Sequence, residues 1–431
     1  MVVTTRTAWA MLAGAVLLVW WPTAASVVLW ALTVTALVAL DVALAASPRR
    51  LVLERATPAQ VRLGEVTHSD VLVTNHGRRG VRGLLRDAWP PSTGASPDRH
   101  SLRVPAGERV RVRTPLRPTR RGDRVADRVT VRTFGPLGLA GRQRSTAVPG
   151  TVRVLHPFPS RRHLPSRLSR LREIDGRSAV RRRGQGTEFD SLRDYVEGDD
   201  VRSIDWRATA RRSSVVVRTW QPEQHRHVVI VVDTSRTSAG RVGDVPRLDA
   251  AMDAALLLTA LASRAHDRVD VIAGDQVVRV RVGGSAERGT LLADVVSALA
   301  PVDAALVETD WTALVSGLIG RGHRRALVVL LTPLEPAAVE EGLLPVLPAL
   351  VRRHRVVVAS VSDPAVTALR LARETVQDAY GAAAAERTVT QRRRVAEALE
   401  RLGVDVIDAD ADTLPPRLAD HYLRLKSEGL L

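Results

Sequence analysis

Two apolar runs near the start of the chain are separated by a proline. Residues 8–21 are almost wholly apolar, Pro22 and Thr23 follow, and a second, mostly apolar run covers residues 24–46. A membrane-spanning helix needs about 20 apolar residues, within a range of about 17–25. The second run meets this length and the first is short, so the pattern predicts a transmembrane helical hairpin over residues 1–50.

The charges that flank the two runs predict an orientation. Arg6 precedes the runs, Arg49 and Arg50 follow them, and the turn carries no charge. The positive-inside rule then places both ends, and the bulk of the chain, in the cytoplasm at the cell membrane. A cleaved signal peptide is the competing interpretation of the first run, but a second apolar run directly behind it argues against cleavage. We expect Asp41, near the end of the second helix, to be solvated.

Residues 51–158 alternate between apolar and polar positions with a period of two. The segment 109–114 reads Arg-Val-Arg-Val-Arg-Thr, residues 129–132 repeat the pattern, and Asn75-His76-Gly77 is a turn signal. Such strands between Gly, Pro and Asn predict an antiparallel β-sandwich. The alternating arginines are expected on its solvent face, where contact with anionic lipid headgroups is a second interpretation.

Residues 159–226 combine an arginine-rich stretch with a dense motif. Residues 160–183 hold nine arginines against Glu173 and Asp175 and show no strong periodicity. This stretch predicts a linker that lies along the membrane or along another domain. Nucleic acid is not an expected partner, because the interleaved aromatic residues that would stack bases are missing.

Residues 227–431 alternate buried apolar strands with helices. The first strand, His-Val-Val-Ile-Val-Val, ends at Asp233, and a nearly continuous apolar helix follows it. This alternation predicts an α/β fold with a doubly wound, mainly parallel sheet. In such sheets ligands bind outside the carboxyl ends of the strands, which is where Asp233 lies.

The charge of the chain also differs between its N-terminal part and the α/β region. The 431 residues carry a formal net charge of +17 and no cysteine, which excludes disulfides, cysteine zinc sites and thiol nucleophiles. Residues 1–230 hold 39 basic and 19 acidic side chains, whereas residues 231–431 hold 24 and 27. The excess positive charge therefore lies beside the predicted anchor, and the α/β region is slightly acidic.

A motif within residues 184–211 alternates acids and arginines with aromatic rings. Its characteristic residues are Glu188, Phe189, Arg193, Tyr195, Gly198, Asp199, Arg202, Asp205 and Trp206. The pattern predicts an extended segment held by Arg–carboxylate pairs and buried rings. Two roles stay open: a brace that packs the linker onto the last domain, or a partner surface formed by the exposed acids Asp199 and Asp200.

This motif resembles the domain-of-unknown-function 58 family, whose hallmark reads Glu-Phe-x-x-Leu-Arg-x-Tyr-x-x-Gly-Asp-x-x-Arg-x-Ile-Asp-Trp. The family's layout of two membrane helices, a β-rich region, the motif and a von Willebrand factor A-like domain is similar to the pattern found along this chain. The resemblance implies a membrane-anchored protein that is often encoded near a MoxR-type AAA+ ATPase, with no established catalysis.

The segment Asp233-x-Ser235-x-Thr237 is similar to the first element of the metal-ion-dependent adhesion site of von Willebrand A domains. Hydroxyl and carboxylate oxygens suit Mg²⁺, and Thr309 is a candidate ligand from a second loop. Pro333 stands where the usual further acid is expected, and Glu335 is a poor substitute, so the predicted site is degenerate. The alternative is that Asp233 and its neighbours bond only to their own loop.

Motifs typical of enzymes are missing. The chain has no Walker loop, no His-Glu-x-x-His and no Gly-x-Ser-x-Gly. The acids Asp408, Asp410 and Asp412 are interpreted as a solvated loop. We therefore expect a non-enzymatic, membrane-anchored scaffold that binds a protein partner, a MoxR-type AAA+ ATPase, in complex assembly. A basic membrane-surface or nucleic-acid binder is the alternative, and a metal-dependent hydrolase is a third, weaker one.

Overall fold

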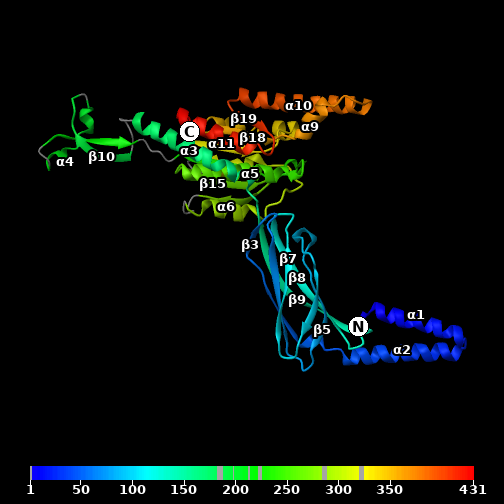
Figure 1. Cartoon of the computed structure of the whole chain (residues 1–431). Coiled ribbons are helices and arrows are strands. Elements are labelled where there is room, and N and C mark those ends of the chain that lie inside the picture. The colour runs from blue at the N-terminus through cyan, green and yellow to red at the C-terminus, as the bar shows by residue number, and fades with distance from the viewer. Residues whose placement is uncertain are drawn as a thin grey trace. The chain divides into compact units, whose positions relative to one another are not determined.

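The computed structural model describes residues 2–181, 188–197, 199–211, 214–221, 226–283, 289–319 and 325–431 (Figure 1). The chain divides into two compact units, Met1–Pro157 and Phe158–Leu431. The first is rich in antiparallel strands and the second is a mixed α/β unit.

The first unit contains two consecutive helices, α1 (Thr5–Trp20) and α2 (Ala24–Leu44). Thr23 caps α2 by accepting a hydrogen bond from the Ser26 amide, and Ser26 returns one to the Thr23 amide. Among the described residues, one helical segment, Ala24–Arg50, is long and apolar enough to cross a membrane.

The carboxylate of Asp41 is buried, so the expectation that it is solvated is wrong. Its Oδ1 accepts a hydrogen bond from the amide of Leu137 at 2.8 Å, and its Oδ2 accepts from Leu139 at 2.7 Å and Ala140 at 2.9 Å. The loop fits this closely because Gly135 has no side chain: a Cβ there would lie 2.1 Å from the Asp41 Oδ1. Sequence reasoning missed this burial because the loop comes from far along the chain.

The strands of the first unit form two sheets. One has the order β1-β9-β8-β5-β6 with β3 beside β9, and the other has the order β2-β4-β7. All pairs are antiparallel except β3 with β9. The strands are β1 (Val2–Val3), β2 (Leu51–Ala56), β3 (Gln60–Arg62), β4 (Thr67–Asn75), β5 (Val81–Asp87), β6 (Arg99–Val104), β7 (Arg109–Leu116), β8 (Gly122–Phe134) and β9 (Ala140–Leu155).

Alternation along these strands separates a core from a charged surface. On β7, Val112 and Thr114 are buried, whereas Arg111 and Arg113 are exposed. The core gathers valine and leucine side chains from both sheets, among them Val71, Leu85 and Val129. The period-two pattern therefore places the arginines outside, as expected of half-buried strands.

The second unit is built on a six-stranded sheet of order β16-β15-β12-β17-β18-β19. The pairs from β15 to β19 are parallel, and β16 joins the edge antiparallel. The strands are β12 (His227–Asp233), β15 (Arg268–Gly274), β16 (Val278–Val282), β17 (Ala326–Leu331), β18 (Arg355–Val361) and β19 (Asp405–Ala409). The helices are α5 (Arg247–Arg264), α6 (Leu291–Leu299), α7 (Trp311–Ile319), α8 (Leu347–Val351), α9 (Pro364–Leu371), α10 (Val376–Arg401) and α11 (Leu414–Glu428).

The apolar strands are buried along nearly their whole length, as is typical of parallel strands covered on both faces. Helix α5 is also buried almost all round, which explains its continuous apolar sequence. The segment between β17 and β18 is not one continuous helix: a π-helical turn (Ala338–Leu343) is followed by the short α8. Pro345 and Pro348 lack the amide hydrogens that a continuous helix needs.

The arginine-rich stretch after residue 159 is a helix, α3 (Leu164–Arg181), rather than a linker without periodicity. Leu164, Leu168 and Leu171 follow helical spacing, and Leu171 is 3% exposed. The Arg167 guanidinium forms a fork on Asp420 of α11, with Nη2–Oδ2 at 2.8 Å. The sequence did not predict the helix because its apolar face consists of only three leucines among many arginines.

Candidate functional site

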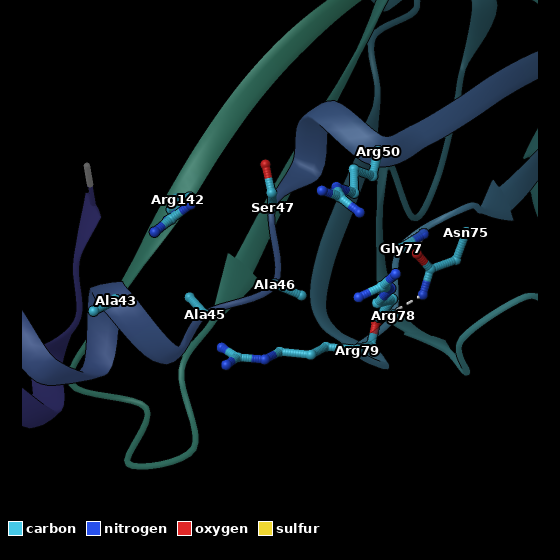
Figure 2. A pocket seen from close by; sticks show the side chains of 10 residues that line it. All are labelled: Ala43, Ala45, Ala46, Ser47, Arg50, Asn75, Gly77, Arg78, Arg79 and Arg142. Carbon is cyan, nitrogen blue, oxygen red and sulfur yellow. Dashed lines mark hydrogen bonds between the residues drawn. The ribbon is translucent and has the colours of Figure 1, made fainter.

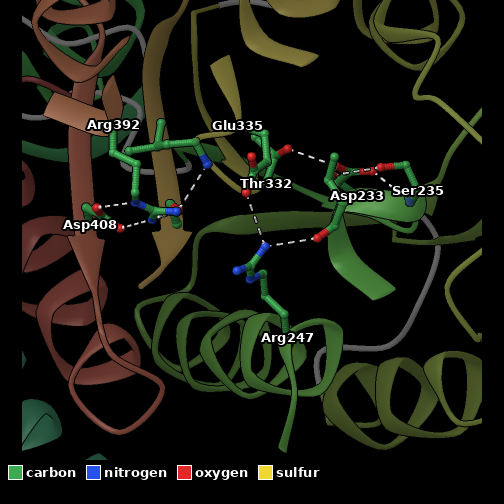
Figure 3. Close-up of polar contacts among 10 residues, drawn as sticks. Asp233, Ser235, Arg247, Thr332, Glu335, Arg392 and Asp408 are labelled. Carbon is green, nitrogen blue, oxygen red and sulfur yellow. Dashed lines mark hydrogen bonds and ion pairs between the residues drawn. The ribbon is translucent and has the colours of Figure 1, made fainter. Parts of the chain in front are cut away.

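The four residues predicted to form a metal site lie together where β12 ends (Figure 3). Oδ1 of Asp233 accepts hydrogen bonds from the Ser235 amide at 2.8 Å and the Thr309 hydroxyl at 2.7 Å. The Thr237 hydroxyl lies 3.4 Å from Oδ2 and 3.0 Å from the Ser235 hydroxyl. We call this group, together with Thr332, the Asp233 cluster.

Thr332 is the member that sequence reasoning missed. Its hydroxyl donates to Oδ2 of Asp233 at 2.8 Å, and both side chains are buried. The parallel pairing of β12 with β17 ends at Val232 and Leu331, and the next residues along the chain are Asp233 and Thr332. The sequence pattern predicts an acid at the next position, where Pro333 stands, and it gives no separate role to Thr332.

The donor set fits part of a Mg²⁺ shell. Oxygen atoms from one carboxylate and several hydroxyls suit a hard cation that keeps some of its waters. However, Asp233 is the carboxylate at the centre, and its oxygens already accept several hydrogen bonds. Across the described residues, no group of three or more histidines and acids is arranged to hold a metal.

Arg247, at the start of α5, lies beside the cluster and was not predicted. Its Nη1 donates to the Thr237 carbonyl at 3.1 Å and lies 3.7 Å from Oε1 of Glu335. Burial first, and then the like charge of Arg392, lower the pKa of the Arg247 guanidinium. Glu335 thus faces an arginine 3.7 Å away, which disfavours its use as a ligand for a cation.

A further charged network lies on the other side of Arg247 (Figure 3). Arg392 of α10 binds Asp408 with Nη2–Oδ1 at 2.7 Å, and the same nitrogen donates to the Ser360 hydroxyl at 3.0 Å. Asp408 therefore belongs to β19 and an ion pair, so its interpretation as part of a solvated loop is wrong. Asp410 accepts a hydrogen bond from the Thr413 amide just before α11.

The motif folds as a small hairpin that carries one helical turn. Strands β10 (Glu188–Asp194) and β11 (Val216–Gln221) pair antiparallel, and α4 (Trp206–Thr209) lies between them in sequence. Glu188 and Phe189 pair with Gln221 and Trp220. Gly198 lies outside the described residues.

Acids of the motif are used within the hairpin. Asp199 pairs with Arg193 and accepts the Val196 amide at 3.0 Å. Asp205 caps α4 through the Ala208 amide at 3.0 Å and binds Arg218 at 2.7 Å. These contacts lower the pKa of both carboxyls: chiefly the Arg193 hydrogen bond for Asp199, and the Ala208 amide, then Arg218, for Asp205.

Two rings of the motif are exposed, contrary to the prediction that they are buried. Trp206 is 68% exposed and Tyr195 is 37% exposed, and Val196 and Val201 beside them are 61% and 63% exposed. A two-stranded hairpin with one helical turn is too small to bury them. The Arg202 amide donates to Asp200 at 3.0 Å, while its side chain is exposed.

Comparison with known proteins gives one family and no assigned activity. Residues 191–405 match the model of a family described as "Protein of unknown function DUF58". "Uncharacterized protein Rv1480" of Mycobacterium tuberculosis and "Uncharacterized protein Mb1516" of Mycobacterium bovis are each 29% identical over 185 residues, or 42% of this chain. The match spans 56% of those relatives' length.

Among solved structures, the CARDB domain of the PF1109 protein from Pyrococcus furiosus, in complex with di-metal ions, is 18% identical. It covers 24% of this chain and 91% of its own, with a TM-score of 0.19. A score this low does not establish a shared fold.

Proposed function

We propose that this protein is a membrane-anchored, cytoplasm-facing scaffold that binds a protein partner and has no catalytic role. The observation that carries the proposal is the exposure of four apolar side chains of the motif: Tyr195, Val196, Val201 and Trp206. We call these side chains the motif surface. Exposed aromatic and apolar side chains are typical of contact sites between proteins.

The frame of the motif supports this role. Asp199 and Asp205 are committed to Arg193, Arg218 and backbone amides. Their carboxylates therefore shape the hairpin, and the apolar side chains are left to make the contact. This differs from both roles left open by the sequence: a brace with buried rings, and a partner surface formed by Asp199 and Asp200.

The α/β unit supports a von Willebrand A-like assignment. Its parallel strands order as β15-β12-β17-β18-β19, and an Asp-x-Ser loop follows the strand β12. We propose a doubly wound sheet of that type, with the Asp233 cluster at its carboxyl edge. Mg²⁺ is a candidate ligand there, one that needs water or a partner's carboxylate to complete its shell.

The helices α1 and α2 support a two-helix anchor. Trp9, Trp20 and Leu29 are 70%, 79% and 68% exposed, and further apolar side chains along both helices are exposed as well. Soluble proteins rarely expose apolar patches of this kind. A bilayer would cover them, and Arg49 and Arg50 would stay on the cytoplasmic side.

A MoxR-type AAA+ ATPase is the partner that we propose, on the basis of the family resemblance. The test uses the full chain in detergent with the MoxR-type ATPase purified from the same organism. We expect Tyr195→Ala/Trp206→Ala to weaken binding at least tenfold. Tyr380→Ala removes another ring, 76% exposed on α10, and serves as the matched control. Unchanged binding by the double variant would overturn the role of the motif surface.

A further inference from the structure

A pocket rich in arginine lies where helix α2 meets the first β sheets (Figure 2). It measures about 280 Å³ and is formed by the end of α2, the residues that follow it, and the turn between β4 and β5. Four of its ten lining residues carry guanidinium groups: Arg50, Arg78, Arg79 and Arg142. We call it the arginine pocket.

The positive charge of this pocket is not neutralised within the described part of the chain. The pocket has no acidic lining residue, and none of its four arginines forms an ion pair with a described carboxylate. Elsewhere in the same unit arginines do find acids, as Arg113 finds Asp70 and Arg153 finds Asp123. The arginine pocket therefore gathers four guanidinium groups that no described carboxylate neutralises.

Two of the arginines are held in place by the end of α2. Nε of Arg142 donates to the Val42 carbonyl at 3.1 Å, and Nη1 of Arg79 donates to the Leu44 carbonyl at 3.2 Å. A guanidinium has five N–H donors, so each keeps donors for a ligand. The carboxylate of Asp41, the acid of α2, is occupied by three backbone amides and does not compete.

The turn that carries Arg78 and Arg79 is also fixed. The Asn75 amide donates to the carbonyls of Arg79 at 3.0 Å and Val104 at 3.2 Å, while its oxygen accepts the Gly77 amide at 2.9 Å. Asn75 is 1% exposed. These hydrogen bonds of Asn75 therefore hold the backbone that presents Arg78 and Arg79 in place, as a binding site requires.

We propose that the arginine pocket binds the phosphate group of an anionic lipid. Guanidinium groups bind phosphate through paired N–H donors, and the pocket adjoins the end of the apolar helix, where headgroups of a bilayer would lie. This inference rests on the proposed membrane anchor. It gives that anchor a lipid preference, set by four side chains rather than by general basic charge.

The test uses the full chain in a nonionic detergent and counts bound lipids by native mass spectrometry. The probes are phosphatidylglycerol, phosphatidylcholine and inorganic phosphate. The variant is Arg50→Gln/Arg78→Gln, because neither side chain caps α2. The control, Arg99→Gln/Arg120→Gln, removes the same charge from exposed positions at the opposite ends of the strands.

We expect the wild type to bind phosphatidylglycerol at least tenfold more tightly than phosphatidylcholine. The pocket variant should lose about 30-fold in affinity for phosphatidylglycerol, given the usual contribution of each arginine near a lipid surface. The control should retain wild-type affinity. Arg50→Lys/Arg78→Lys keeps the charge but loses the paired N–H donors, so it should recover only part of the loss.

Equal losses in the pocket variant and the control would overturn the proposal. Displacement of the lipid by inorganic phosphate at the same concentration would also overturn it, by showing that the ligand is free phosphate. Carbonate extraction of cell membranes tests the anchor separately. A chain that resists extraction but lacks lipid preference refutes the pocket alone, whereas a chain that is extracted refutes the proposed anchor.

Discussion

The Thr332 hydroxyl donates a hydrogen bond to Asp233 across two neighbouring parallel strands, at 2.8 Å. The same carboxylate accepts the Ser235 amide and the Thr309 hydroxyl, so one buried side chain joins three segments at the carboxyl edge of the sheet. These hydrogen bonds give the Asp233 cluster a structural role that does not depend on a bound ion.

Replacing Asp233 tests that purpose. We expect Asp233→Ala to lower the free energy of unfolding by about 3 kcal/mol, because several buried donors lose a charged acceptor. Thr332→Val removes one donor and should cost about 1 kcal/mol. Urea unfolding of the full chain in detergent measures both. Equal stability of Asp233→Ala and the wild type would contradict the role assigned to the carboxylate.

The single carboxylate of the Asp233 cluster and the nearby Arg247 predict that Mg²⁺ has little effect on the stability of the protein. We expect weak binding, so that 1 mM Mg²⁺ shifts the melting temperature by less than about 1 °C. An ion at or below its Kd stabilises by about 0.4 kcal/mol at most. The result is contradicted if Mg²⁺ raises the melting temperature by several degrees in the wild type and has no effect in Asp233→Asn.

The buried Asp41 predicts local stability of the β8–β9 loop. Asp41→Asn replaces one acceptor oxygen by a donor that faces a backbone amide, at a cost of about 2 kcal/mol. Hydrogen exchange at Leu137, Leu139 and Ala140 should then accelerate about 30-fold. Asp98→Asn, at an exposed acid of the same unit, is the control. Unchanged exchange in Asp41→Asn would refute this function of the carboxylate.

Asp253 predicts a pH dependence of stability. Burial raises the pKa of its carboxyl to about 6, despite hydrogen bonds from Ser160. The folded chain then binds more protons than the unfolded chain between about pH 4 and 6, so this group makes stability fall as pH rises through that window.

The variant Asp253→Asn should remove this contribution. We expect the melting temperature of Asp253→Asn, relative to that of the wild type, to increase as the pH rises from 4 to 7. The exposed acid Asp294 of α6 supplies the control, Asp294→Asn. Parallel melting curves of wild type and Asp253→Asn across this range would show that the carboxyl titrates normally.

Lys426, the single lysine of the chain, is buried beside Asp267 with Nζ–Oδ1 at 3.1 Å. We expect Lys426→Met to destabilise the protein by about 3–5 kcal/mol, because a buried charge loses its partner. The double variant Asp267→Asn/Lys426→Met should be more stable than Lys426→Met. Urea unfolding compares the two, and a less stable double variant would argue against the ion pair.

The features that depend on neighbouring residues in the sequence, such as strands and their buried faces, could be predicted from the sequence. Period two along residues 109–114 places Val112 inside and Arg111 outside, and the apolar strand before Asp233 is β12. The grouping of Ser235, Thr237 and Thr309 around Asp233 was expected from the resemblance to the metal-ion-dependent adhesion site, and the edge position of Asp233 from the end of its strand.

What the sequence did not predict depends on contacts between distant segments. Asp41 is buried by a loop almost a hundred residues away, and Arg247 reaches the cluster from α5. The stripe of α3 is too narrow to detect among arginines. Trp206 was assigned to a core because aromatic rings usually are, yet its hairpin has too little surface to cover it.

The contact of Asp41 with the β8–β9 loop has a mechanical consequence. Leu137, Leu139 and Ala140 hold the helix end by three hydrogen bonds, and Thr133 adds a fourth to the carbonyl of Ala46 at 2.7 Å. Because of these hydrogen bonds, α2 cannot rotate about its axis unless β8 and β9 move with it. A rotation of α2 is therefore transmitted to the two strands, and the helix is not joined to them by a flexible connection.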